Sequence, residues 1–303
     1  MPMSEETIAV SGGVRRSWVA LLPRQLRLYQ WAKNALVFIP LLGAHRLSDR
    51  NLVLRNVLAF FCFGLVASSV YVLNDLRDVE ADRHHPRKRF RPLASGAMPV
   101  MVGKALAATL LFAGALLAMQ LPKEFRFVLA GYWAATLGYS LGLKKRPILD
   151  VGILAGLYTV RMYAGSAATG VPVSEWLASF AMFLFLSLAF IKRAAELVAA
   201  GEALPGRGYR PVDQGPIFTM GITSGYLSVL VLALYVSSQD VRRLYTHPGW
   251  LWLLCPLVLF WISELWLRAR RGEVDDDPLI FALRNRSSWI VLALGAAVVW
   301  FGI

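Results

Sequence analysis

A polar stretch from residue 71 to residue 96 carries the residues best suited to chemistry. It reads YVLNDLRDVEADRHHPRKRFRPLASG and directly follows an apolar run long enough to cross a membrane. If a helix continues through it, a rotation of about 100° per residue brings Asp75, Asp78 and Asp82 onto one face. Asn74 lies at the edge of that face. Three carboxylates on one stripe repel each other, which predicts a bound cation. Mg²⁺ fits because it prefers hard oxygen ligands and is completed by water and substrate phosphates.

Positive charges follow these carboxylates at once. They are Arg83, Arg87, Lys88, Arg89 and Arg91. Guanidinium and ammonium groups pair well with phosphate oxygens, so the acidic face and the basic loop together predict a magnesium–diphosphate site. The same charges would suit exposed ion pairs, or a loop that contacts anionic lipid and sets topology. The spacing, the place at a membrane helix end and the closing sequence RPLASG favour the site.

The aspartate spacing and the closing sequence resemble a known family. NDxxDxxxD from Asn74 to Asp82, followed by RPLASG at residues 91–96, is similar to the first aspartate-rich motif of the UbiA superfamily of intramembrane prenyltransferases. The string EADRHHPRKRFRP at residues 80–92 resembles the branch typified by decaprenyl-phosphate phosphoribosyltransferase. This resemblance implies an all-α, UbiA-like bundle of membrane helices with a Mg²⁺-dependent catalytic site on the three aspartates.

Length and composition predict one membrane domain. The 303 residues are 57% hydrophobic and have a mean hydropathy of +0.52, which is too apolar for a soluble protein. The net charge of +13 comes from basic residues between apolar segments. The expected partners are therefore phosphates and anionic headgroups, and not nucleic acid. Cys62 and Cys255 both lie in apolar segments, which predicts neither a disulfide framework nor a metal site with cysteine ligands.

Nine apolar segments are expected to form transmembrane helices. They lie near residues 27–44, 52–74, 99–119, 125–143, 149–169, 174–198, 215–237, 248–267 and 286–303. Each is close to the roughly 20 residues that a bilayer requires. We expect residues 1–26 to form a basic N-terminal arm and residues 27–303 to form the catalytic domain. The sequence leaves the oligomeric state open, a homo-oligomer included.

Basic residues are unevenly divided between the two ends of these segments. With the N-terminus inside, that side collects about three times as many Lys and Arg residues as the other side, the aspartate-rich loop included. This bias predicts a multi-pass protein of the plasma membrane whose site faces the cytoplasm. Mg²⁺ and a soluble phosphorylated substrate would then have access to it.

Two groups of polar residues near that face are further candidates for substrate binding. In the first segment, Lys33 could reach a phosphate or extend to the membrane interface, and Asn34 lies beside it. After the fourth segment, Tyr139, Lys144 and Lys145 suit either a second phosphate site or a positive anchor at the membrane surface. The resemblance favours the substrate site in both places. At the second place, the superfamily has a tyrosine and a lysine.

Charged residues within later segments are also candidates. Arg161 lies about 16 Å into the fifth segment, a costly place that predicts a functional side chain facing the bundle interior. An ion pair with an aspartate is the alternative. Near the end of the sixth segment stand Lys192, Arg193 and Glu196, where aromatic prenyltransferases of the superfamily have a second aspartate-rich motif. Cations in place of carboxylates indicate an additional phosphate, although Lys192 and Glu196 could simply form an i,i+4 pair.

The sequence does not decide the function of two loops. The loop at residues 205–216 could be a lid or an ordinary connector, because its glycines and prolines suit both. In the acidic run at 275–277, Asp277 stands before Pro278, which favours a helix N-cap over a metal ligand. The sequence does not decide whether this run takes part in the site.

The resemblance implies a transfer reaction at the aspartate-rich face. Mg²⁺ would bind the diphosphate of 5-phosphoribosyl 1-diphosphate, while basic residues hold its 5-phosphate. A polyprenyl phosphate such as decaprenyl phosphate would attack the anomeric carbon and release diphosphate, supplying arabinan precursors for a cell envelope. The alternative is an aromatic prenyltransferase that uses a polyprenyl diphosphate and an acid such as 4-hydroxybenzoate. A non-catalytic lipid carrier would explain the helices but not the metal face.

Overall fold

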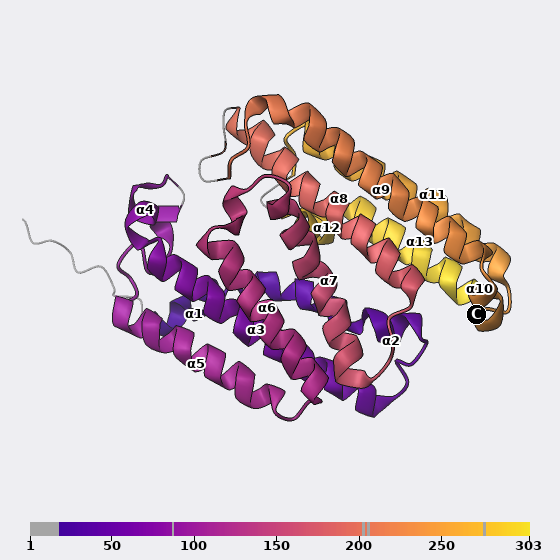
Figure 1. Cartoon of the computed structure of the whole chain (residues 1–303), viewed down its shortest axis with the longest axis horizontal. Helices are drawn as coiled ribbons and strands as arrows, with labels where there is room; N and C mark the ends of the chain where they lie inside the picture. The colour runs from indigo at the N-terminus through magenta and orange to yellow at the C-terminus, as the bar shows by residue number, and fades with distance from the viewer. Residues whose placement is uncertain (1–17, 87, 202–203, 205–206, 275–276) are drawn as a thin grey trace, which may run out of the picture.

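The structure is a computed structural model that describes residues 18–303 except 87, 202–203, 205–206 and 275–276. Within these residues every regular element is helical, which confirms the all-α prediction (Figure 1). The long helices are α3 (Arg50–Arg77), α5 (Val100–Ala118), α6 (Lys123–Leu141), α7 (Leu149–Thr169), α8 (Glu175–Ala200), α9 (Gln214–Ser237), α11 (Leu254–Arg270) and α13 (Arg286–Gly302). The short ones are η1 (Trp18–Leu21), α1 (Leu22–Gln25), η2 (Leu28–Phe38), α2 (Ile39–Gly43), α4 (Val79–His84), η3 (Lys88–Phe90), η4 (Leu143–Lys145), η5 (Pro211–Asp213), α10 (Gln239–Leu244), η6 (Pro248–Leu253) and α12 (Pro278–Arg284).

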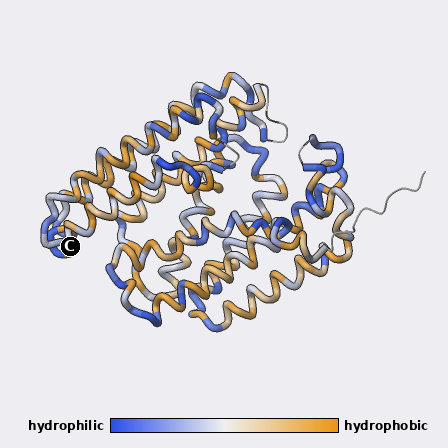
Figure 2. Tube along the Cα trace, turned by 180° about the vertical axis from the view of Figure 1, so that it is seen from behind, coloured by the Kyte–Doolittle hydropathy of each residue, from blue (hydrophilic) through white to orange (hydrophobic). Residues whose placement is uncertain are grey.

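All nine predicted segments are helical in the structure. By length and composition alone, five described helical stretches could cross a membrane: residues 50–77, 100–118, 175–200, 211–237 and 248–270. The other four segments form α6 and α7, which are less apolar, and α13 and the η2–α2 pair, which are shorter. Large apolar side chains such as Phe127 and Trp300 point outward, and Figure 2 shows hydrophobic residues along the outer helices. This is the surface expected of a protein whose solvent is lipid.

Two groups of helices pack on either side of α7. α3, α5 and α6 form one group, and α8, α9, α11 and α13 form the other (Figure 1). α7 contacts α3, α6, α8 and η2, so it joins the two groups. One apolar core gathers around Phe63 and Phe125 in the first group, and the larger core surrounds Phe185 and Trp266 in the second. Polar and charged side chains buried near α7 therefore lie where the two groups meet.

The first predicted segment does not begin as an α-helix. Its first 11 residues form the 3₁₀ helix η2, and only α2 is α-helical. Pro40 explains the change, because it has no N–H for the carbonyl of Leu36, which accepts from Ile39 instead. Of the predicted arm at residues 1–26, residues 1–17 lie outside the described residues, and the rest form η1 and α1 near α3. The boundary at residues 26 and 27 stays a prediction.

Small residues allow η2 to approach α7 closely. A Cβ atom at Gly165 would lie 1.8 Å from the carbonyl oxygen of Val37. The side chain of Asn56 donates to the same oxygen over 3.0 Å, which fixes α3 to this contact as well. The approach brings Lys33 and Asn34 of η2 into the bundle interior, where both are buried.

We expect Gly165→Ala to destabilise the protein, because the new methyl group forces η2 away from α7. Overpacking of this kind costs about 1–3 kcal/mol. Gly156→Ala is the matched control on the same helix, because nothing lies within 4 Å of a Cβ at that position. Thermal unfolding of the two purified variants in detergent measures the difference. Equal melting temperatures would show that the approach of η2 to α7 is not tight in solution.

Candidate active site

The predicted aspartate-rich helix is broken in the middle. α3 ends at Arg77, α4 starts at Val79, and Asp78 at the junction has φ −96° and ψ 9°. Val79, the first residue of α4, is buried and packs in an apolar cluster with Leu93. The prediction that the three aspartates share one helical face required one helix through the whole stretch. The structure has two helices there instead.

Asp75 and Asp82 nevertheless meet at one cation, in a group that we call the aspartate cluster. Arg91 Nη1 lies 3.1 Å from Asp75 Oδ1 and 2.6 Å from Asp82 Oδ2. Arg27 donates to the same Oδ1 atom over 2.6 Å. Gln25 donates to Asp75 Oδ2 over 3.0 Å. Both carboxylates are buried, so they depend on these partners.

The aspartate cluster has donor atoms suited to a divalent cation. No three His, Cys, Asp or Glu side chains in the described part of the chain are grouped to hold a metal ion. Two hard carboxylates do converge on one point, which the Arg91 guanidinium occupies. Carboxylate oxygens are the ligands that Mg²⁺ prefers, so Asp75 and Asp82 fit this ion. Asp78 is half-buried at the junction beside them.

Three other predicted residues around this cluster face water. Lys88 and Arg89 are exposed on η3, and the exposed Arg83 donates to Glu80 and to the carbonyl of Ala94. Asn74 is half-buried near the end of α3. Arg87 lies outside the described residues. The structure does not bring these side chains onto the buried carboxylates, but it leaves their charges open to a soluble anion.

A second buried network, the Asp150 cluster, forms where α6, α7 and α8 meet. Arg193 Nε lies 2.7 Å from Asp150 Oδ2, and both residues are 0% exposed. Tyr139 donates to Asp150 Oδ1 over 2.8 Å and accepts from Arg207 over 2.6 Å. Arg193 also pairs with Glu196, and the alternative i,i+4 ion pair of Lys192 with Glu196 is not formed within the described residues. These predicted binding residues are paired with one another in the structure.

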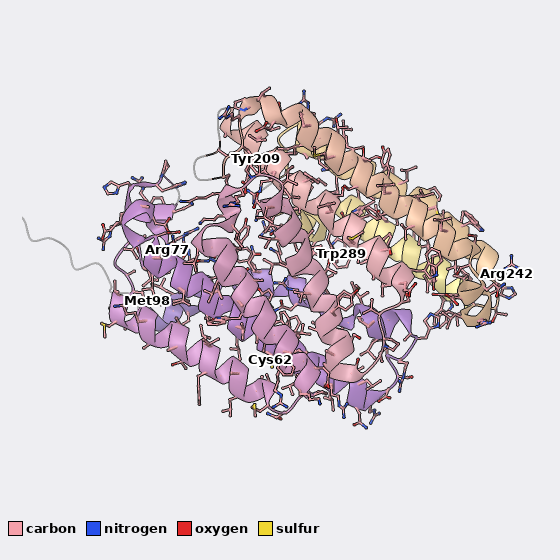
Figure 3. All side chains as sticks on the ribbon, viewed as in Figure 1. Cys62, Arg77, Met98, Tyr209, Arg242 and Trp289 are labelled. Atoms are coloured by element: carbon pink, nitrogen blue, oxygen red, sulfur yellow. The ribbon has the colours of Figure 1, made fainter. Side chains whose placement is uncertain are left out.

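The loop before α9 covers this cluster. Tyr209 is buried, and its hydroxyl accepts from the backbone N–H of Ile148 over 2.9 Å. Gly208 has φ +74°, and a Cβ there would lie 2.5 Å from the carbonyl oxygen of Lys145. Figure 3 shows Tyr209 and Arg77 on the opposite side of the molecule from Arg242. The loop therefore packs on η4 at the same end as the aspartate-rich stretch.

The two lysines of η4 differ in exposure. Lys145 is exposed, whereas Lys144 is half-buried. Burial lowers the pKa of Lys144, and the nearby Asp78 carboxylate opposes this shift. Asp78 is thus electrostatically coupled to Lys144, while Asp75 and Asp82 are paired with Arg91.

A third group, the lysine cluster, joins three distant parts of the chain. Lys33 of η2 forms an ion pair with Asp277 Oδ2, although 244 positions separate them. Tyr158 of α7 donates to both Asp277 oxygens at 3.4 and 3.5 Å. Lys192 of α8 is close enough to interact electrostatically with Asp277 and Lys33. Sequence reasoning missed this role of Asp277, and no local signal in the sequence could have shown it.

Asp277 is also the N-cap of α12, as the sequence predicts. Its Oδ1 atom accepts from the backbone N–H groups of Leu279 and Ile280, and Pro278 follows it. Burial raises the pKa of Asp277, but the ammonium groups of Lys33 and Lys192 outweigh burial and hold the pKa below its usual range. The carboxylate is therefore charged at neutral pH.

Arg161 faces the bundle interior as predicted. Its Nε atom donates to Asn34 Oδ1 and its Nη2 atom to the hydroxyl of Tyr132, each over 3.0 Å. The guanidinium lies 4.9 Å from the centre of the Tyr132 ring. Within the described residues it makes no ion pair with an aspartate, so the alternative interpretation is wrong. Arg161 fixes Asn34, and with it the turn of η2 that carries Lys33.

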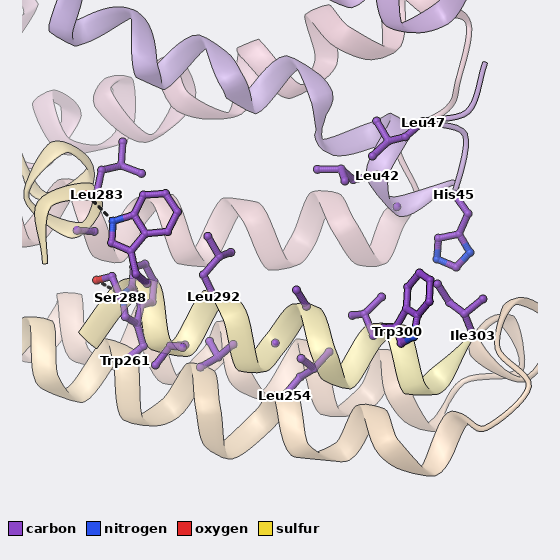
Figure 4. A pocket seen from close by; sticks show the side chains of 18 of the residues that line it. Leu42, His45, Leu47, Leu254, Trp261, Leu283, Ser288, Leu292, Trp300 and Ile303 are labelled. Atoms are coloured by element: carbon purple, nitrogen blue, oxygen red, sulfur yellow. Dashed lines mark hydrogen bonds between the residues drawn. The ribbon is translucent and has the colours of Figure 1, made fainter. Parts of the chain in front are cut away.

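An apolar groove leads along the second helix group. It has a volume of about 880 Å³ and runs between α2, α11, α12 and α13 (Figure 4). The side chains that line it include Leu42, Trp261, Leu283, Trp289, Leu292 and Trp300. Because α12 lines the groove and Asp277 caps α12, the groove lies next to the lysine cluster.

We expect Asp150→Asn to lower the free energy of unfolding by about 3 kcal/mol, because it leaves the fully buried Arg193 without its main counter-charge. Glu80→Gln is the control, since the exposed Glu80–Arg83 pair contributes little. Chemical denaturation in detergent micelles measures both. Equal stability of the two variants would mean that the Asp150 cluster does not hold the helices together.

Comparisons with known proteins give a consistent result. The model of the UbiA prenyltransferase family matches residues 36–289. Protein y4nM of Sinorhizobium fredii is 38% identical over 90% of this chain, which spans 54% of that protein. Decaprenyl-phosphate phosphoribosyltransferase of Mycobacterium tuberculosis is 38% identical over 92% of this chain and 95% of its own length. A UbiA homologue from Archaeoglobus fulgidus, solved with DMAPP and Mg²⁺, matches with a TM-score of 0.65 at 18% identity, over 91% of this chain and 98% of that one.

Proposed function

This chain belongs to the UbiA prenyltransferase family, and from this premise we propose that it transfers a 5-phosphoribosyl group from 5-phosphoribosyl 1-diphosphate to a polyprenyl phosphate. It is a transferase and a multi-pass membrane protein. The observation that carries the proposal is the end of α8, which has no aspartate-rich motif and carries Lys192 within electrostatic range of Lys33 and Asp277. The M. tuberculosis relative, a decaprenyl-phosphate phosphoribosyltransferase by name, supports the same activity.

The aspartate cluster is the proposed site of the leaving diphosphate. Asp75, Asp78 and Asp82 would hold Mg²⁺, which when bound would supply positive charge for the leaving diphosphate. Arg27 and Arg91 lie against these carboxylates and can donate to phosphate oxygens once substrate arrives. The exposed Arg83, Lys88 and Arg89 stand at the entrance, where positive charge attracts a soluble polyphosphate.

The polyprenyl phosphate is proposed to enter from the apolar groove. An isoprenoid tail buries apolar surface against the tryptophan and leucine side chains that line the groove. Its phosphate then reaches the lysine cluster next to α12. A phosphate monoester is largely ionised at neutral pH, so it can attack the anomeric carbon without a general base.

The two sites are close enough to act together. Arg27 immediately precedes η2 and pairs with Asp75, and Lys33 of η2 pairs with Asp277, so η2 links the two clusters. Donor and acceptor held side by side react as one complex, which removes much of the entropic barrier. We further propose that the protein lies in the plasma membrane with this site on the cytoplasmic side. We also propose that the product supplies arabinan precursors for a cell envelope.

A transfer assay tests the proposal. Purified protein is given labelled 5-phosphoribosyl 1-diphosphate, decaprenyl phosphate and Mg²⁺, and we expect label to move into the organic phase. EDTA should abolish this transfer. Asp75→Asn should lower the rate about a hundredfold or more, because it removes a charged ligand of the proposed metal site. Asp49→Asn is the control, because Asp49 caps the other end of the same helix α3.

Two other outcomes would contradict the proposal. Product formed only from a polyprenyl diphosphate and 4-hydroxybenzoate would show an aromatic prenyltransferase. Lipid binding that tolerates EDTA, with no transfer to either acceptor, would show a carrier.

A further inference from the structure

The two carboxylate oxygens of Asp277 have separate roles. Oδ1 accepts from the backbone N–H groups of Leu279 and Ile280 and so caps α12. Oδ2 is the partner of the Lys33 ammonium group. The cap therefore does not depend on the ion pair, and Oδ2 can leave Lys33 while α12 keeps its first turn.

The lysine cluster holds more positive charge than Asp277 can neutralise. Lys33 is only 8% exposed, and Asp277 is its ion-pair partner. Lys192 makes no hydrogen bond or ion pair with any residue in the described part of the chain, although it is coupled to Asp277. Lys33 of η2 and Tyr158 of α7 contact this carboxylate, and Lys192 lies on α8, which packs against α12, within electrostatic range of it. With both lysines protonated, two ammonium groups and one carboxylate leave one positive charge in a cluster whose Lys33 and Asp277 are buried.

The negative charge of a phosphate monoester could compensate the excess positive charge of the lysine cluster. Such a monoester carries close to two negative charges at neutral pH and three acceptor oxygens, so it can pair with Lys33 and Lys192 at once. α12 contacts both η2 and α8, and its residues Leu279 and Leu283 line the apolar groove. A ligand with a phosphate at one end and an apolar chain at the other would therefore span the cluster and the groove.

We propose that Asp277 Oδ2 occupies the position of a substrate phosphate monoester and gives way when that phosphate binds Lys33 and Lys192. This inference rests on the proposed function, whose two substrates each carry one such group: the phosphate of the polyprenyl lipid and the 5-phosphate of the ribosyl donor. The carboxylate keeps Lys33 paired while the site is empty, since a buried ammonium group without a counter-charge is costly. It also discourages weaker anions, which must displace it to enter.

Asp277→Asn separates the two roles of the side chain. The amide oxygen of asparagine can still cap α12, but its NH₂ group cannot accept from Lys33. Removal of the competing carboxylate should tighten binding of the matching phosphate monoester on the order of tenfold. Asp49→Asn is a matched control, because Asp49 Oδ1 caps α3 and Oδ2 pairs with Arg46 in the same way, but at an exposed position.

The measurement is calorimetric titration of the full chain in detergent with farnesyl phosphate, ribose 5-phosphate and farnesol. Tighter binding of farnesyl phosphate by Asp277→Asn places the lipid phosphate at the cluster, and tighter binding of ribose 5-phosphate places the donor there. Asp49→Asn should bind all three probes as the unchanged protein does. Adding Lys33→Gln to Asp277→Asn should remove the gain. Asp277→Ser, which also caps without a charge, repeats the test if the asparagine variant is unstable.

Three results would overturn the inference. Unchanged or weaker binding of both phosphates by the Asp277 variants would mean that the carboxylate orients Lys33 and does not compete with substrate. An equal gain for farnesol would place the effect in the groove, and a gain that survives Lys33→Gln would place it elsewhere. Because binding is measured without 5-phosphoribosyl transfer, failure of the transfer assay and failure of this inference are distinguishable.

Discussion

Burial of charge inside a membrane bundle is the constraint on which the rest of this structure depends. A cation removed from water is tolerated only with a counter-charge or several acceptors. Arg193 has Asp150, Asp75 has Arg27 and Arg91, and Lys33 has Asp277. These pairs join separate elements: α7 with α8, α3 with the segments that carry Arg27 and Arg91, and η2 with the start of α12. The contacts that neutralise the charges therefore also hold these elements together.

This constraint separates neighbouring residues into different networks. Lys192 and Arg193 are adjacent on α8, yet a rotation of about 100° per residue turns them to different sides. Arg193 is fully buried against Asp150, whereas Lys192 faces Lys33 and Asp277. Of these two adjacent cations, Arg193 is paired with protein carboxylates and holds helices together. Lys192 makes no ion pair within the described residues, so in the proposed reaction it would be available to a ligand.

Much of the fold was accessible from the sequence, because hydrophobic segments of membrane length and local capping signals act over short distances. The nine helical segments, the inward-facing Arg161 and the N-cap at Asp277 follow from such signals. The break at Asp78, beside the packed Val79, and the 3₁₀ helix η2, which precedes Pro40, were not predicted from such signals. Ion pairs such as Lys33–Asp277 join positions 244 residues apart and required the folded chain.

The Arg91 and Asp277 contacts follow one physical rule. Arg91 stands where the sequence places a metal ion between Asp75 and Asp82, and Asp277 stands between the cations of the lysine cluster. In both cases a protein charge neutralises groups that the proposed reaction would pair with metal or phosphate. Without such internal partners the bundle would bury unpaired charge whenever substrate is absent. In the proposed reaction, ligand binding would then be an exchange of charge partners, which would keep the helices assembled while the active site fills.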